Sequence, residues 1–186
     1  MRAMNDAILV GIGTALADDP QLTCRLPGMT ARSPVRVVLD PQLRLPATSA
    51  LVRSAGAPPL WIMTDEAAAG EAARALTSQG AEILRVPAIA GRLDVVAVLR
   101  LLADRGITRL MVEGGPTVAA AFVRADMVDE AVVMRGPQPI GTDGIDALNA
   151  LPLSALTESC TLRLSGTEIL APDTIESFER PCSPVL

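Results

Sequence analysis

The chain has 186 residues, of which 49% are apolar, a formal net charge of -5 and no histidine. This length suffices for one domain with a substantial core. No apolar run reaches the roughly 18 to 20 residues that span a bilayer, and the N-terminus lacks a secretory signal pattern. We therefore predict a cytoplasmic protein with no membrane contact, with one domain over residues 1–177 and a loosely ordered tail over residues 178–186.

The same composition excludes several kinds of chemistry. Two Phe, one Trp and no Tyr, with an acidic net charge, provide neither the basic surface nor the stacking platform of a nucleic-acid binder. Without histidine the chain has no Ser-His or Cys-His nucleophile pair and no ordinary zinc site. Cys24, Cys160 and Cys182 are distant from one another and odd in number, which indicates reduced thiols and no metal site. Any chemistry must therefore depend on carboxylates, backbone dipoles and a bound cofactor.

The first third of the chain is predicted to contain two strands separated by loops. A buried strand over residues 6–10 leads into a glycine-containing turn at 11–14 and a loop at 15–20. The carboxylates of Asp18 and Asp19 in that loop either cap a helix or turn, or face a ligand. After these come an extended piece at 21–25, a Pro/Gly loop at 26–34, a strand at 35–40 and an irregular segment at 41–59 with at most one helical turn near 49–53.

Strands and helices alternate in the middle of the chain, and the last third differs. We predict strands at 60–63, 81–86 and 108–112, and helices at 66–79, 92–104 and from Pro116 onward. Thr64 and Asp65 are predicted to cap the first of these helices. A strand at 129–134, a loop at 135–144 and a hairpin or bent strand at 161–170 follow. The pattern predicts a three-layer α/β fold with a mixed, mainly parallel sheet and an antiparallel edge.

The stretch most informative about function is Leu110-Met111-Val112-Glu113-Gly114-Gly115-Pro116-Thr117. A short apolar strand meets two glycines, and Pro116 then opens a helix, because proline suits the first helical position. The glycines leave no Cβ between backbone and ligand, and the helix N-terminus favours a phosphate. Glu113 is expected at the sheet edge, where ligands of open α/β sheets bind. A tight connection without a ligand is the alternative explanation of this turn.

A family resemblance follows from three motifs taken together. Residues 6–25 (DAILVGIGTALADDPQLTCR), residues 34–40 (PVRVVLD) and the Glu-Gly-Gly-Pro-Thr turn resemble the reductase domain of the bifunctional riboflavin-pathway deaminase/reductase, in order from residue 2 to about 145. The resemblance implies a dihydrofolate-reductase-like fold and a homodimer. It also implies reduction by NADPH of 5-amino-6-(5-phosphoribosylamino)uracil to 5-amino-6-(5-phosphoribitylamino)uracil, with hydride delivered to C1′ of the opened ribose.

The resemblance also implies a role for individual residues. The implied cofactor contacts are Thr14, Asp18, Gly115, Pro116, Thr117, Val118, Ala119, Ala120 and Ala121. The implied substrate contacts are Arg2, Leu22, Arg25 and Glu113. An arginine fork suits a phosphate dianion, although Arg25 alone is also typical of a surface cation. Glu113 and Asp18 are the candidate catalytic residues, which either hydrogen-bond the sugar or assist the proton that opens its ring.

The site for the adenosine 2′-phosphate of NADPH is less well defined. The position after Asp40, often polar in the family, is Pro41 in this chain. Arg44 and Thr64 are therefore the candidates for this contact.

The chain departs from the family pattern at its beginning. Family members start this domain with a strand and an Asp-Gly loop ahead of the match to Arg2, and the deaminase zinc signature requires a histidine that this chain lacks. Loss of a central strand would expose two sheet edges or leave a gap. Three explanations stay open: Met1 is not the true start, the chain is a fragment, or it is a shortened relative. The two functional hypotheses are an NADPH-dependent reductase and a non-catalytic, ligand-binding or dimerising remnant of the same fold.

Overall fold

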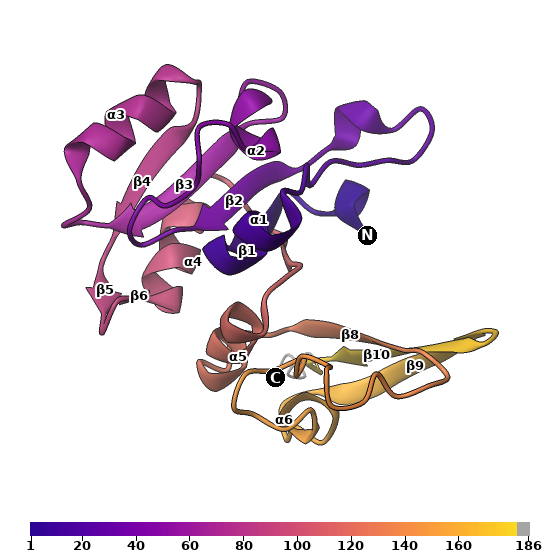
Figure 1. Cartoon of the computed structure of the whole chain (residues 1–186). Coiled ribbons are helices and arrows are strands. Elements are labelled where there is room, and N and C mark those ends of the chain that lie inside the picture. The colour runs from indigo at the N-terminus through magenta and orange to yellow at the C-terminus, as the bar shows by residue number, and fades with distance from the viewer. Residues whose placement is uncertain (182–186) are drawn as a thin grey trace, which may run out of the picture. The chain divides into compact units, whose positions relative to one another are not determined.

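The computed structural model describes residues 1–181, and the chain divides into two compact units, Met1–Val118 and the residues from Ala119 onward. Figure 1 shows the two units in the colours of the chain. The division falls inside helix α5 (Pro116–Arg124). One domain over residues 1–177 stays a prediction.

The first unit is built on a five-stranded sheet in the order β4-β3-β2-β1-β7, in which every pair is parallel. Its strands are β1 (Ala7–Gly11), β2 (Val35–Leu39), β3 (Leu60–Asp65), β4 (Glu82–Val86) and β7 (Leu110–Val112). All five residues of β1 are buried, as expected for a strand covered on both faces. The register pairs Leu9 with both Val37 and Val112, so the carboxyl ends of β2, β1 and β7 lie at one edge of the sheet.

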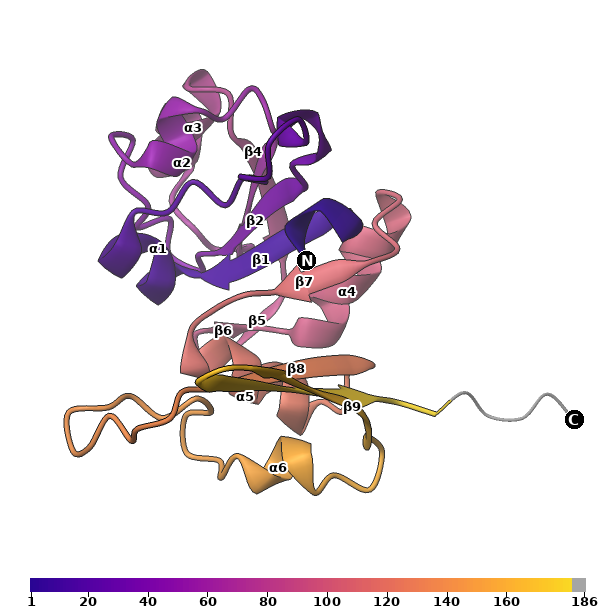
Figure 2. The same cartoon turned by 90° about the vertical axis from the view of Figure 1, so that its right-hand side faces the viewer.

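Helices cover both faces of this sheet, so that the first unit has three layers, as predicted. One face packs against α1 (Ile12–Asp18), α2 (Ala50–Arg53) and α3 (Gly70–Ser78), through a core that includes Ile8, Val10 and Leu51. Figures 1 and 2 show α4 (Val95–Asp104) on the opposite face. Arg105, at the end of α4, lies over the ring of Trp61 in β3. The short elements η1 (Arg2–Met4), η2 (Thr30–Arg32), β5 (Ala88–Ile89) and β6 (Arg92–Leu93) complete the unit.

Three helix starts differ from the prediction. The segment from Ile12 to Asp18 is helical directly after β1 and is not a turn. The helix predicted from residue 66 begins at Gly70, because Asp65 stays in β3 opposite Val86. The helix predicted from residue 92 begins at Val95. Residues 92–93 instead pair in the β5–β6 hairpin, and the Asp94 carboxylate caps the helix by accepting from two backbone N–H groups.

A buried arginine fixes the loop after α2. Arg36 in β2 has no exposed surface, and its guanidinium donates to Ser54 Oγ at 2.7 Å, to the Ser54 carbonyl at 2.6 Å and to the Pro58 carbonyl. Burial lowers the pKa of this guanidinium, and its Nε has no partner among the described residues. The charge is thus balanced by carbonyl dipoles, which explains how an arginine fits inside an otherwise apolar strand.

The second unit contains an antiparallel sheet in the order β8-β10-β9. Its elements are the larger part of α5, β8 (Glu130–Arg135), α6 (Ser154–Thr157), β9 (Arg163–Leu170) and β10 (Asp173–Glu179). The segment predicted as a hairpin or bent strand at 161–170 contains one strand. The pairing of β9 with β10 skips Ser165, and such a bulge corresponds to the bent alternative. The antiparallel strands expected from the sequence therefore form a sheet of their own.

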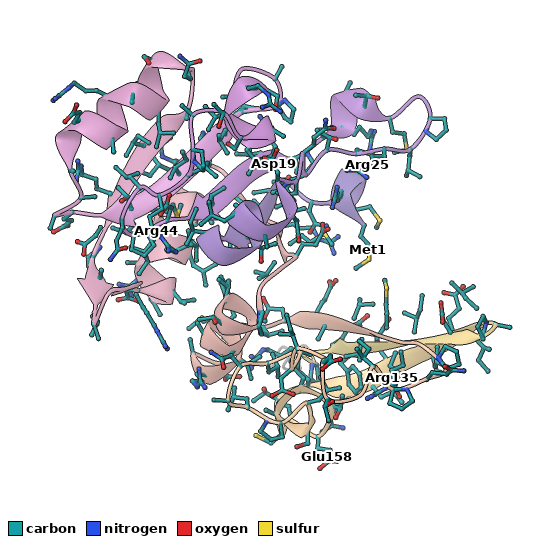
Figure 3. All side chains as sticks on the ribbon, in the orientation of Figure 1. Met1, Asp19, Arg25, Arg44, Arg135 and Glu158 are labelled. Atoms are coloured by element: carbon teal, nitrogen blue, oxygen red, sulfur yellow. The ribbon has the colours of Figure 1, made fainter. Side chains whose placement is uncertain are left out.

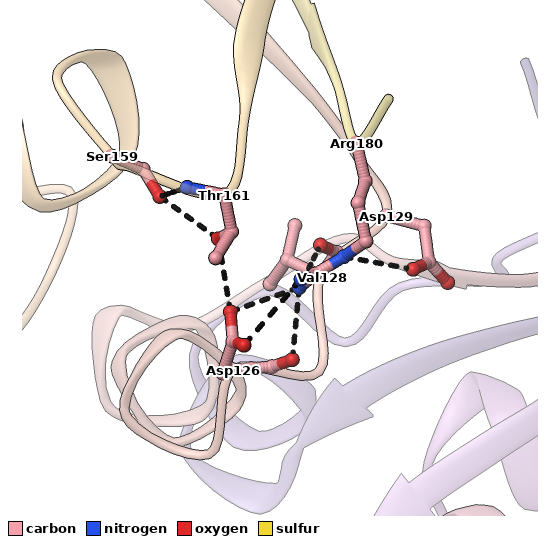
Figure 4. Close-up of polar contacts among 6 residues, drawn as sticks. All are labelled: Asp126, Val128, Asp129, Ser159, Thr161 and Arg180. Atoms are coloured by element: carbon pink, nitrogen blue, oxygen red, sulfur yellow. Dashed lines mark hydrogen bonds and ion pairs between the residues drawn. The ribbon is translucent and has the colours of Figure 1, made fainter. Parts of the chain in front are cut away.

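One arginine holds the end of β10 in this unit (Figure 4). Arg180 donates from Nη2 to Asp126 Oδ1 at 2.8 Å and to the carbonyls of Asp126 and Val128, and its Nε lies 3.3 Å from Asp129 Oδ1. The hydroxyl of Thr161 donates to the same Asp126 oxygen at 3.0 Å. The hydrogen bond from Arg180, and then that from Thr161, lowers the pKa of Asp126.

The predicted tail begins too early. Phe178 is buried and pairs with Ala131 and Leu164, so residues 178 and 179 are the end of β10. The rest of that prediction, from residue 182, lies outside the described residues, as does Cys182. Cys24 and Cys160 are free thiols, as predicted.

Candidate active site

Two strand-to-helix junctions pack together at the carboxyl ends of β1 and β7. A Cβ at Gly11, the last residue of β1, would lie 2.7 Å from Cγ2 of Val118 in α5. A Cβ at Gly115 would lie 2.9 Å from Oγ1 of Thr14 in α1, and Gly115 has a φ of +79°. Only glycine fits both the contact and the left-handed backbone at Gly115. The predicted turn from strand to helix is confirmed, and the glycines also have a packing role that the sequence did not reveal.

The same turn presents unused hydrogen-bond donors. The N–H of Glu113 donates to the Leu9 carbonyl at 3.0 Å, whereas the N–H groups of Gly114 and Gly115 have no acceptor within residues 1–181. Pro116 follows as the first residue of the nine-residue helix α5. Free N–H groups beside the positive end of a helix dipole suit a phosphate or another anion. The donor set present at this turn therefore fits the pyrophosphate of a dinucleotide.

Two of the predicted substrate residues lie in direct contact. Arg2 in η1 donates two hydrogen bonds to the Glu113 carboxylate, from Nε to Oε2 at 2.7 Å and from Nη2 to Oε1. Its Nη1 donates to the Thr23 carbonyl at 3.0 Å. The hydrogen bond to Glu113 is the main reason that the pKa of the Arg2 guanidinium is raised. The Arg2 and Glu113 side chains are 24% and 32% exposed, so the pair is partly open to solvent. It joins three segments distant in sequence beside the glycine turn.

The loop that carries the other predicted substrate residues has one buried and one exposed member. Leu22 is buried in the core and has a φ of 55°, which leaves its side chain little surface for a ligand. Arg25 is exposed and has no hydrogen bond or ion pair with any described residue. Figure 3 shows Arg25 on the side of the first unit away from Arg44. Between them in the loop, Cys24 is buried and its N–H donates to Ser33 Oγ at 3.0 Å.

The adjacent aspartates at the end of α1 have different surroundings. Asp19 has a φ of 39° and its Oδ1 accepts from the N–H of Ala50, the first residue of α2, at 2.7 Å. This contact is the capping role that the sequence left open. Asp18 is exposed and makes no hydrogen bond or ion pair in the part of the chain that is described. Its roles toward cofactor and sugar stay predictions.

The remaining predicted cofactor contacts lie along the first two turns of α5. Thr117 is exposed, whereas Val118, Ala119 and Ala121 are partly buried. Ala120 has no exposed surface, so it offers a ligand nothing in this conformation. The N-terminal end of the helix is thus the part open to a cofactor, and assignment of the individual residues stays a prediction.

The two candidates for contact with the 2′-phosphate, Thr64 and Arg44, differ in their exposure. Thr64 is fully buried and its hydroxyl donates to the Pro41 carbonyl at 3.0 Å, so it cannot also contact a ligand. Asp40 is also fully buried, and its Oδ2 accepts from the N–H of Leu45 at 2.8 Å. This contact fixes the loop that presents the exposed Arg44. Apart from its place at the end of a strand, nothing in the sequence indicates this role of Asp40.

Within residues 1–181, no group of three or more Cys, Asp and Glu side chains is arranged to hold a metal ion. None of the described helices has the length and apolar character needed to cross a membrane.

Fold and site together define an α/β protein with a glycine turn at the carboxyl ends of its parallel strands, and the unused N–H groups of this turn suit an anion. Its family is shown by comparison, since the profile of the RibD C-terminal domain matches residues 1–175. The chain belongs to this family, which confirms the resemblance derived from the sequence.

Individual relatives agree with this assignment. The riboflavin biosynthesis protein RibD of Bacillus amyloliquefaciens is 38% identical over 169 residues, which cover 84% of this chain and 44% of that protein. The 2,5-diamino-6-ribosylamino-4(3H)-pyrimidinone 5′-phosphate reductase of Methanothermobacter thermautotrophicus is 33% identical over 182 residues, covering 96% of this chain and 81% of that protein. The chain spans about half the length of the RibD relatives it matches.

A solved structure shows the same fold. The crystal structure of the deaminase/5-amino-6-(5-phosphoribosylamino)uracil reductase from Thermotoga maritima matches with a TM-score of 0.72 at 26% identity, over 97% of this chain and 47% of that chain. The predicted α/β class with a mainly parallel sheet is therefore confirmed.

Proposed function

We propose that the chain is the NADPH-dependent reductase that converts 5-amino-6-(5-phosphoribosylamino)uracil to 5-amino-6-(5-phosphoribitylamino)uracil. The observation that carries the proposal is the Glu113 carboxylate, fixed by Arg2 next to the free N–H groups of Gly114 and Gly115. Such an arrangement provides an acceptor for sugar hydroxyls beside a cradle for a pyrophosphate. Relatives named as RibD and as a pyrimidinone 5′-phosphate reductase support this choice of substrate class.

Each side of the site has a distinct task in this proposal. The nicotinamide supplies a hydride to C1′ of the opened ribose. Glu113 accepts a hydrogen bond from the sugar and orients C1′, while the exposed guanidinium of Arg25 holds the 5′-phosphate. Asp18 is the second candidate for moving the proton that opens the ring. The protein thus contributes orientation and charge, and the cofactor contributes the reducing equivalent.

The preference for NADPH over NADH is assigned to Arg44. In the sheet, β2 and β7 lie on either side of β1, and neighbouring strands are about 5 Å apart. The loop after β2 is therefore about 10 Å from the glycine turn after β7. That separation suits the adenosine end of a cofactor whose pyrophosphate occupies the turn. Arg44 is exposed there on a loop fixed by Asp40, whereas Thr64 is buried. A guanidinium is well suited to the added phosphate of NADPH.

We also propose a homodimer in the cytoplasm. On one face of the antiparallel sheet of the second unit, the apolar side chains of Val132, Met134 and Leu170 are exposed in the single chain. A second copy would cover them, whereas an internal core does not account for their exposure. Analytical ultracentrifugation tests this directly: a mass of two chains is expected, and a monomer at micromolar concentration contradicts the proposal.

One observation favours the second candidate, a non-catalytic remnant that binds ligand or dimerises. β7, which leads into the site, is an edge strand of its sheet in the described chain. An unpaired edge beside the site would weaken the position of the reacting groups.

The decisive experiment is turnover by the whole chain. NADPH oxidation is followed by absorbance with the phosphoribosylaminouracil. A parallel reaction uses 2,5-diamino-6-ribosylamino-4(3H)-pyrimidinone 5′-phosphate, the compound in the name of the Methanothermobacter thermautotrophicus relative. Oxidation with the uracil, with the ribityl product identified by mass spectrometry, supports the proposal. Turnover of the pyrimidinone alone would correct the substrate. Binding of NADPH without turnover of either compound would favour the remnant.

A further inference from the structure

The loop after β2 is held by side chains that cannot themselves reach a ligand. Thr64 in β3 has no exposed surface, and its hydroxyl donates to the Pro41 carbonyl at 3.0 Å. The N–H of Asp65 donates to the same carbonyl at 3.2 Å. Asp40 is also fully buried, and its Oδ2 accepts from the N–H of Leu45 at 2.8 Å. Both ends of the loop are therefore fixed by contacts with buried side chains.

The middle of this loop holds Arg44 between two buried leucines. Leu43 and Leu45 are 7% and 3% exposed and pack in the core of the first unit, whereas Arg44 is exposed. Leu43 has a φ of 54°, a left-handed conformation that a leucine seldom adopts unless its surroundings hold it there. Its N–H donates to the Asp40 carbonyl at 3.2 Å. The two leucines thus anchor the loop, and the arginine between them faces solvent.

One oxygen of the buried Asp40 carboxylate is left without a donor. Its Oδ1 has no hydrogen-bond partner in residues 1–181, and its Oδ2 accepts from a neutral backbone N–H. A buried carboxylate that is only partly satisfied costs stability. An apolar residue in its place would avoid that cost but would leave the N–H of Leu45 without its acceptor. Asp40 therefore serves the conformation of the loop more than the stability of the core.

We propose that Asp40 and Thr64 are positioning residues, which set the cofactor specificity by holding the loop that presents Arg44 to the 2′-phosphate of NADPH. This inference rests on the proposed function, in which Arg44 makes that contact, and it identifies residues that determine specificity without touching the cofactor. A loop that is held in place before binding loses less conformational freedom when the phosphate binds. Specificity for NADPH then depends on the shape of the loop as well as on the charge of Arg44.

The first test replaces Thr64 by a residue of nearly the same shape. Thr64→Val removes the donor to the Pro41 carbonyl and should lower the ratio of kcat/KM for NADPH to that for NADH about fivefold. Thr64→Ser keeps the hydroxyl, so the ratio should stay within about twofold. Ser49→Ala is the matched control, because it removes another buried hydroxyl, the acceptor for the N–H of Val52 in α2. This control should lower Tm and leave the ratio unchanged, and the same result in Thr64→Val would overturn the proposal.

The second test concerns Asp40 and its coupling to Arg44. Asp40→Asn keeps an oxygen for the N–H of Leu45 and should hold the ratio within about twofold, whereas Asp40→Ala should lower it about fivefold or more. In an Arg44→Ala background, Thr64→Val and Asp40→Ala should each lower the ratio less than about twofold further, because the side chain that they position is gone. Independent, multiplicative effects would contradict positioning through Arg44. Thr64→Val decides the question where Asp40→Ala does not fold.

Binding of cofactor fragments separates this inference from the proposed reaction. If the unmodified chain reduces neither pyrimidine, the proposed reaction fails, and calorimetric titration with 2′-phospho-ADP-ribose and with ADP-ribose still tests the loop. Thr64→Val should raise the Kd for the first compound about fivefold and the Kd for the second less than about twofold, since only the first has the 2′-phosphate. Equal Kd values for the two compounds in the unmodified chain, or an equal rise of both in Thr64→Val, would overturn the proposal.

Discussion

Arg2 in the first unit and Arg180 in the second each bind a carboxylate and also donate to backbone carbonyls, yet their surroundings differ. The carboxylate of Glu113 is 32% exposed, and the next two residues have N–H groups without an acceptor in residues 1–181, whereas the carboxylate of Asp126 is 62% exposed and already accepts from Arg180 and Thr161. The Arg180 cluster joins the end of β10 to the turn after α5, and these contacts satisfy its own donors. An arginine–carboxylate pair thus indicates a ligand site only where neighbouring polar groups are left unused.

The largest expected effect is at the carboxylate of the first pair. Glu113→Gln should lower kcat for the phosphoribosylaminouracil about 100-fold, because a neutral amide neither pairs with Arg2 nor accepts as strongly from the sugar. Steady-state NADPH oxidation measures it, with thermal unfolding as the check that the variant is folded. Full turnover in this variant would remove Glu113 from the chemistry and would break the contrast between the two pairs.

The next largest effect is expected on KM for the pyrimidine, at the exposed Arg25 of the first unit. Arg25→Ala should raise KM for the pyrimidine about 30-fold, since hydrogen bonds to a charged phosphate are each stronger than neutral ones. KM for NADPH should stay within about twofold. Arg32→Ala provides the matched control in the following loop. A larger change in KM for NADPH than for substrate would reverse the assignment of Arg25.

Much of the first unit could be predicted from sequence, because short apolar runs and glycines are local signals. β1, β2 and β4, the turn at Gly114 and the start of α5 at Pro116 agree with the pattern to within about a residue. The start of α1 could not be predicted, because two glycines within three residues favour a turn. The contact of Gly11 with Val118 could not be predicted either, because these residues are distant in sequence.

The candidate site could be predicted only in part. The residues of the glycine turn and the carboxylate were found from their place after a strand. The pairing of Arg2 with Glu113 was not, because the two are 111 positions apart and meet only through the parallel pairing of β1 with β7. Arg36 was missed for a related reason: its partners are backbone carbonyls of a loop, which carry no sequence signal.

A smaller effect is expected at Arg44. Arg44→Ala should lower the ratio of kcat/KM for NADPH to that for NADH about tenfold, through loss of one charge-assisted contact to the 2′-phosphate. Activity with NADH should stay within about twofold, because NADH lacks that phosphate. Arg92→Ala, at another exposed arginine of the first unit, is the control. An unchanged ratio would place the 2′-phosphate contact elsewhere.

The second pair should affect stability without affecting the site. Arg180→Gln is expected to lower Tm, because the carbonyls of Asp126 and Val128 lose a donor, while kcat and both KM values stay within about twofold. Differential scanning calorimetry and the NADPH assay measure the two properties in the same preparation. A drop in kcat with unchanged Tm would show that the Arg180 cluster serves a ligand too, and the comparison would then fail.

The smallest expected effect is a pH dependence of that stability. Hydrogen bonds from Arg180 and Thr161 hold the pKa of Asp126 below its ordinary value, so the folded state favours the ionised carboxylate. Its stabilising contribution is present above the unfolded pKa of about 3.9 and is lost as the pH falls through the lower folded pKa. Asp126→Asn should therefore lower Tm more at pH 7 than at pH 2.5, relative to the unmodified chain at each pH. An equal decrease in Tm at both pH values would assign the effect to packing and not to charge.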